Sequence, residues 1–180
     1  MSKSGGSPRE IAIPVAAFDA LRKEIQQRAG MLDAVRALHE AGYQAGLAAA
    51  HAVHQGAGGD SFRLSEAGFW TNLSDYFSRR GWGTLQHSAA HPAVGLLSAD
   101  DWAEAEPDDV RPEASCSFTA GFLSGLLSQL AGGPVAVLEV ECRTRGDDRC
   151  VFAFGSETAI HEVYGAMLDG ADLQTALQTL

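Results

Sequence analysis

Residues 116–156 read CSFTAGFLSGLLSQLAGGPVAVLEVECRTRGDDRCVFAFGS, and this stretch carries the strongest structural signals of the chain. Its first part, Cys116–Leu130, is apolar with helical spacing and ends at two glycines and a proline, which terminate a helix. Val135–Cys142 is rich in β-branched residues, and Cys150–Phe154 is again apolar. A Gly-Asp-Asp turn lies between these two segments, so the pattern predicts a helix followed by a β-hairpin.

Helical patterns flank this stretch on both sides. After it, Ser156 is the predicted N-cap of one helix, and a last amphipathic helix carries leucines at positions 173, 177 and 180. Before it, helical periodicity runs over residues 11–55, with Gly30 as the expected break between two helices. The chain therefore has helical segments at both ends.

The middle of the chain changes from helical to extended patterns. Leu64–Gly81 has helical periodicity, with Ser61 or Ser65 as its N-cap. Gly83–Ser88 and Ala93–Ser98 follow as two short predicted strands.

This element order predicts an α+β fold. We expect a small antiparallel sheet, with Val135–Glu141 and Cys150–Phe154 at its centre, covered by several helices. A chain of 180 residues has the size of one domain, which we expect over residues 11–180. Residues 1–10 are expected to form a flexible tail, and because they contain no apolar core they do not form a signal peptide.

Charge and cysteine content exclude several classes of protein. The net charge is −10, which repels phosphate backbones and anionic lipids and argues against nucleic-acid binding. No apolar run approaches the ~20 residues that a membrane helix needs, so no membrane insertion is expected. Three cysteines is an odd number, which argues against a secreted disulfide framework and favours the reducing cytoplasm.

A stripe of small residues marks the second half of the predicted 11–55 helical region. Gly42 and Gly46 lie four residues apart, and alanines at positions 41, 45 and 49 continue the stripe. Small side chains allow another backbone to approach closely. The stripe is either a tightly packed core face or the contact face of a homodimer.

All three cysteines lie in the stretch quoted first. Cys116 is at a predicted helix N-terminus, while Cys142 and Cys150 are on the two arms of the hairpin. Three thiolates that meet in this way, with one further ligand, favour a zinc site. The alternatives are reduced core cysteines or a Cys142–Cys150 disulfide.

The fourth ligand has two candidates, Glu139 and Glu141. Both would point to one face of the strand, whereas Cys142 would point to the other. A twist or bulge near the strand end is therefore required for either carboxylate to join Cys142. Local geometry does not choose between the two.

The same stretch resembles the 4-vinyl reductase domain family. The similar features are the first cysteine, a Gly-Phe-x-x-Gly helix, a Glu-x-x-Cys strand, a Gly-Asp turn and a Cys-x-Phe strand, and the similarity continues through residue 180. The family includes the sensor domains of phenol- and xylene-responsive bacterial activators and is related to Golgi-transport complex subunits and nitric-oxide-sensing haem domains. The resemblance implies a structural zinc held by Cys116, Glu139, Cys142 and Cys150.

The resemblance also implies a function. It suggests an apolar cavity beside the zinc that binds a small hydrophobic molecule, such as an aromatic, a tetrapyrrole or an acyl ligand, in a sensor, carrier or chaperone, and it suggests a homodimer. The alternative that it implies is a subunit or accessory factor of a 4-vinyl (proto)chlorophyllide reductase. Because the sequence carries no nicotinamide or flavin fingerprint, binding is favoured over catalysis.

Aromatic residues beyond the needs of a small core are candidates to line such a cavity, with histidines as orienting polar groups. Core packing is the alternative for Trp102, and a solvated or packed position is the alternative for the histidines, including His51 and His54. Asp100–Glu113 is expected to be a solvated acidic segment. The predicted ligand-binding residues are Trp70, Phe77, Trp82, His87, His91, Trp102, Phe118 and Phe122.

Overall fold

The computed structural model describes residues 10–55, 65–106 and 110–180. The predicted flexible tail, apart from Glu10, lies outside the described residues, as does Ser61. In chain order, the elements are α1 (Val15–Ala29), α2 (Met31–Gln55), α3 (Glu66–Ser78), β1 (Gln86–His91), β2 (Val94–Ala99), α4 (Ser117–Ala131), β3 (Ala136–Glu141), the 3-10 helix η1 (Arg143–Arg145), β4 (Cys150–Gly155), α5 (Glu157–Leu168) and α6 (Leu173–Gln178).

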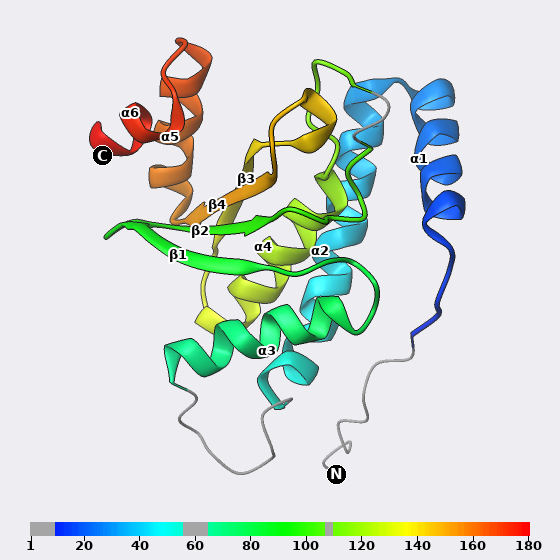
Figure 1. Ribbon diagram of the computed structural model, residues 1–180, viewed down its shortest axis with the longest axis horizontal. Helices are drawn as coiled ribbons and strands as arrows, with labels where there is room; N and C mark the ends of the chain where they lie inside the picture. Colours follow the sequence, from blue (N-terminus) through cyan, green and yellow to red (C-terminus); the bar gives the residue numbers. More distant parts are fainter. Residues whose placement is uncertain (1–9, 56–64, 107–109) are drawn as a thin grey trace.

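The four described strands form one antiparallel sheet in the order β1-β2-β4-β3. Figure 1 shows α5 and α6 on one side of this sheet and α2, α3 and α4 on the other. The α+β prediction is therefore confirmed. The predicted position of the hairpin is half wrong, because β4 is an inner strand whereas β3 is at the edge of the sheet among the described strands. β2, and not β3, shares the centre with β4.

The two faces of the sheet have separate cores. Leu97 and Phe152, which are paired across β2 and β4, pack with α2, α3 and α4. The opposite face carries Val94 and Val151, which pack with α5 and α6. Since side chains alternate along a strand, each inner strand supplies both cores, and the fold has three layers.

Local signals define the helix ends. Gly30 separates α1 from α2 with a φ of 85°, a conformation that glycine adopts without a steric penalty. The side chains of Ser65 and Ser156 accept hydrogen bonds from backbone N–H groups at 3.2 Å each, as helix N-caps do. The helix break at Gly30 and the caps at Ser65 and Ser156 confirm three sequence predictions.

Helices α2 and α4 pack with their backbones almost in contact. A Cβ atom on Gly46 would lie 2.0 Å from the carbonyl oxygen of Phe122, and one on Gly121 would lie 2.0 Å from that of His39. The stripe Gly42–Ala49 is therefore a core face, and its glycines are used within the chain. The stripe no longer supports the homodimer prediction.

None of the described helices combines the length and the apolar character needed to cross a membrane.

We predict that Gly46→Ala destabilises the fold by at least the roughly 1–3 kcal/mol typical of overpacking, because the added methyl meets backbone, which cannot rotate away. Gly165→Ala in α5 is the matched control. Its Cβ would meet nothing within 4 Å, so the gain in helix propensity should stabilise the protein by up to about 1 kcal/mol. Denaturant unfolding of both variants measures these effects. Equal effects of the two substitutions would show that the α2–α4 contact is less tight than described.

Candidate metal centre and apolar pocket

Four side chains converge where α4, β3 and β4 meet. Cys116 is the N-cap residue of α4, Glu139 lies in β3, Cys142 follows β3, and Cys150 begins β4. One ligand atom from each residue lies within 4.8 Å of the others. The three cysteines are buried and free, with 3.8 Å between the sulfur atoms of Cys116 and Cys150. This cluster could hold a metal ion.

A β-bulge places Glu139 in the cluster. The pairing of β3 with β4 shifts register between Glu139, which faces Phe152, and Glu141, which faces Val151. One extra residue in β3 reverses the side-chain alternation, so Glu139 and Cys142 share a face while Glu141 does not. The sequence indicated that such an irregularity was necessary, and the structure shows where it lies.

The carboxylate of Glu139 has one oxygen engaged and one free. Its Oε2 accepts a hydrogen bond from the backbone N–H of Cys116 at 2.9 Å. Its Oε1 is buried and has no hydrogen-bond partner among the described residues. A buried carboxylate oxygen without a donor is costly, and a metal ion would satisfy it.

The charges of the cluster also favour a cation. Burial raises the pKa of Cys116 and that of Glu139, so both groups resist ionisation. Hydrogen bonds from the thiols of Cys116 and Cys150 lower the pKa of Cys142, which makes it the preferred thiolate. Four ionised ligands in a buried site require a compensating positive charge, which a divalent metal ion supplies.

Residues around the cluster hold its ligands in place. The backbone N–H groups of Ser115 and Cys142 donate to the Cys142 sulfur at 3.4 Å and to the Asp147 carboxylate at 2.7 Å, respectively. The Ser115 hydroxyl lies 2.7 Å from that of Thr144 in η1. These contacts fix the turn after β3, and with it the direction of the Cys142 side chain.

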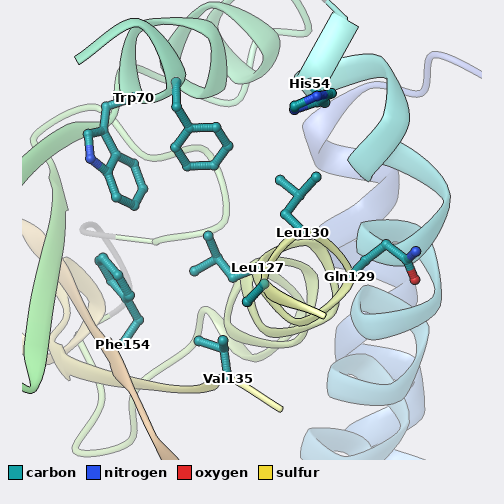
Figure 2. Close-up of a pocket in the computed structure, with 9 residues that line it drawn as sticks. His54, Trp70, Leu127, Gln129, Leu130, Val135 and Phe154 are labelled. Atoms are coloured by element: carbon teal, nitrogen blue, oxygen red, sulfur yellow. The ribbon is translucent and has the colours of Figure 1, made fainter. Parts of the chain in front are cut away.

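A separate apolar pocket lies at the other end of α4. Its volume is about 510 Å³, within the range of small-molecule sites. Figure 2 shows Trp70 and Phe154 on one side of it and Leu127 and Leu130 of α4 on the other. The lining residues are His54, Phe69, Trp70, Leu127, Gln129, Leu130, Ala131, Val135 and Phe154.

Known proteins share the sequence pattern of this region. Residues 109–156 match the 4-vinyl reductase domain family. The predicted resemblance is confirmed. The matched segment contains all four cluster residues and the β3–β4 hairpin. The chain is also 31% identical over 83 residues to the uncharacterized protein MJ0745 of Methanocaldococcus jannaschii, covering 46% of this chain and 44% of that protein. The chain thus spans less than half the length of this curated relative.

Solved structures share the fold. The phenol-responsive sensory domain of the transcription activator PoxR, solved with phenol, matches with a TM-score of 0.70 and 22% identity, covering 82% of this chain and 77% of that one. A vinyl-4-reductase family protein from Methanocaldococcus jannaschii matches at 0.54 and 21%, covering 81% and 82%. Trafficking protein particle complex subunit 3 from Naegleria fowleri, covalently bound to palmitic acid, matches at 0.57 and 13%, covering 78% and 91%.

The predicted ligand-binding residues have three different positions. Trp70 lines the pocket, and His87 stacks on it with ring centroids 3.9 Å apart. His91 lies at the end of β1, where its Nδ1 accepts a hydrogen bond from the N–H of Ala93. The other five form a cluster of aromatic contacts in the interior: Phe77, Trp82, Trp102, Phe118 and Phe122. The ligand-binding role of all eight residues stays a prediction.

Glu104 is a buried carboxylate that the sequence analysis missed. The acidic segment was expected to be solvated, but Glu104 is 0% exposed. Its two oxygens accept hydrogen bonds from the N–H groups of Phe118 and Thr119, each at 2.9 Å, at the first turn of α4. Burial raises the pKa of Glu104 to about 7. The expectation of a fully solvated segment was wrong because the carboxylate caps a helix.

Arg22 connects α1 to the same region. Among the residues of α1, all of which the structure describes, Arg22 alone is buried. Its guanidinium donates to the backbone carbonyls of Glu104 at 3.1 Å and of Ser115 at 3.3 Å, and pairs with Glu106 at 2.6 Å. The helix is thus held by a polar anchor next to the metal cluster.

We predict that Glu104 makes stability depend on pH. Its pKa of about 7 in the fold exceeds the ordinary 4.5, so the folded protein binds the proton more tightly than the unfolded chain does. The free energy of unfolding should therefore fall between about pH 4.5 and pH 7, by about 3 kcal/mol, and level off above. Glu104→Gln should remove this fall.

The exposed substitution Glu162→Gln is the control, and it should keep the wild-type profile. Measurements at one fixed metal concentration make the acid sensitivity of the cysteine cluster common to all three proteins. Parallel pH profiles for the wild type and Glu104→Gln would contradict the prediction.

Proposed function

We propose that the chain is a zinc-containing domain that binds a small hydrophobic molecule without transforming it. The observation that carries this proposal is the apolar pocket between α3, β4 and the C-terminal end of α4. Two proteins of similar fold support it, since one was solved with phenol and another with palmitic acid. The role would be that of a sensor, carrier or chaperone.

The geometry of the cluster supports zinc as the metal. Thiolates about 2.3 Å from a tetrahedral zinc lie about 3.8 Å apart. The sulfur atoms of Cys116 and Cys150 have this separation, 3.8 Å. Three sulfur atoms and the free oxygen of Glu139 complete four ligands. Because a site with four protein ligands has no open position, the zinc would cross-link α4 to the β3–β4 hairpin rather than act on a substrate.

The pocket, rather than the interior, is the proposed binding site. The face of the sheet toward α4 is filled by Phe152 and Trp102, both fully buried. Space begins where Phe154, Trp70 and Leu130 surround the pocket, with His54 as a polar group of its lining. An apolar ligand with one polar group would fit this lining.

Three further sequence predictions stay predictions: a single domain over residues 11–180, a homodimer and a cytoplasmic location.

We predict one zinc ion per chain in protein purified without chelators. Glu139→Gln removes a ligand and should weaken zinc affinity by more than the roughly 10–100-fold typical of residues around a metal's ligands. Glu141→Gln is a matched control on the same strand, because Glu141 lies beyond the bulge and pairs with Arg149 at 3.6 Å. Elemental analysis and chelator competition measure both. Well under one metal per chain, or equal affinities of the two variants, would refute the site.

We predict micromolar or tighter binding of an uncharged aromatic probe, N-phenyl-1-naphthylamine, to delipidated protein. Ala131→Trp adds a bulky side chain to the pocket lining and should weaken binding at least about tenfold, since the apolar area available to the probe is lost. Ala48→Trp on the exposed side of α2 is the control and should bind as the wild type does. No binding by the wild type, or equal binding by both variants, would reject the pocket as the site.

A further inference from the structure

Phe154 lies directly over a glycine of the neighbouring strand. Gly95 of β2 is paired with Phe154 of β4. A Cβ atom on Gly95 would lie 2.3 Å from Cζ of the Phe154 ring, and two further ring atoms would lie within 2.9 Å. The ring therefore occupies the space that any side chain at position 95 would require.

The opposite side of the ring faces α3. The centroids of Phe154 and Trp70 are 5.3 Å apart with an interplanar angle of 48°. Trp70 is itself stacked on His87 of β1, at 3.9 Å and 10°. The Phe154 ring is thus held between Gly95 on one side and Trp70 on the other, and both aromatic rings line the pocket (Figure 2).

The backbone below the ring leaves it few alternative positions. Phe154 also pairs with Val137 of β3, so Gly95, Phe154 and Val137 form one row across the sheet on the face toward α4. The ring extends over the glycine, which lacks a side chain. A methyl group at position 95 would drive the ring away from β2, either into the pocket or over Val137 beside it.

We propose that the Gly95–Phe154 pair determines the depth of the pocket and hence the length of the apolar ligand that it accepts. This inference rests on the proposed function. Phe154 forms the wall of the pocket on the sheet side, and Gly95 keeps that wall low. Removing the ring would open the space down to Gly95, whereas adding a methyl group at position 95 would raise the wall.

A series of para-alkylphenols with increasing chain length, competing against N-phenyl-1-naphthylamine, tests the inference. Each buried methylene should tighten binding about fourfold as long as the pocket has room, and affinity should stop rising once the pocket is full. The chain length at which this happens is the readout. Phe154→Ala should move it to longer chains, and Gly95→Ala should move it to shorter ones.

The double variant Gly95→Ala/Phe154→Ala separates this steric effect from general damage to the fold. With the ring absent, the methyl group at position 95 has no partner to displace, so the double variant should accept the same long chains as Phe154→Ala. Its unfolding free energy should also show that Gly95→Ala costs less in the Phe154→Ala background than in the wild type. This comparison remains informative even if Gly95→Ala alone does not fold.

The outcomes distinguish the two proposals. If the wild type binds neither the probe nor any alkylphenol, the proposed function fails and this inference fails with it. If the wild type binds but the limiting chain length is the same in all folded variants, the proposed function stands and the role of Gly95 and Phe154 is refuted. Additive stability effects in the double variant would likewise refute the contact.

Discussion

The N-terminus of α4 is the point on which the arrangement depends, because two carboxylates from distant segments bind it. Glu104, from the connection after β2, accepts from the N–H groups of Phe118 and Thr119. Glu139, from β3, accepts from that of Cys116. The first N–H groups of a helix lack partners within the helix and carry partial positive charge, so both carboxylates stabilise it. These contacts fix α4 relative to the sheet before any metal ion is considered.

From this point, α4 connects the metal cluster to the pocket. Its length is fixed against α2 by glycines such as Gly46 and Gly121. Fourteen residues separate Cys116 from Leu130, which corresponds to about 20 Å along a helix. A zinc ion at one end is therefore too far away to contact a ligand at the other. Its effect on binding would be structural, through the position of the helix that forms a wall of the pocket.

Much of the fold could be predicted from the sequence, and the reasons are local. Helix ends at Gly30, Ser65 and Ser156 follow from residue chemistry that acts within a few positions. Strand order is different, because it depends on which apolar faces meet, and the placement of β3 at the centre was wrong for that reason. The ligand set came from the family resemblance, since strand alternation alone left Glu139 and Glu141 tied until the bulge was located.

The pocket and the buried polar groups were harder to predict, because a pattern of residue types shows what is apolar but not where packing is incomplete. Large aromatic residues such as Trp102 were candidates for a ligand site, yet the same burial energy draws them into the core. Glu104 lies in a run of acidic residues, and its capping role depends on a helix that begins more than ten residues later. Arg22 completes the same network from the other end of the chain, by donating to the carbonyls of Glu104 and Ser115. A charged residue on an otherwise exposed helix has no sequence signal for burial, so its role follows only from the carbonyl groups that the tertiary fold brings to it.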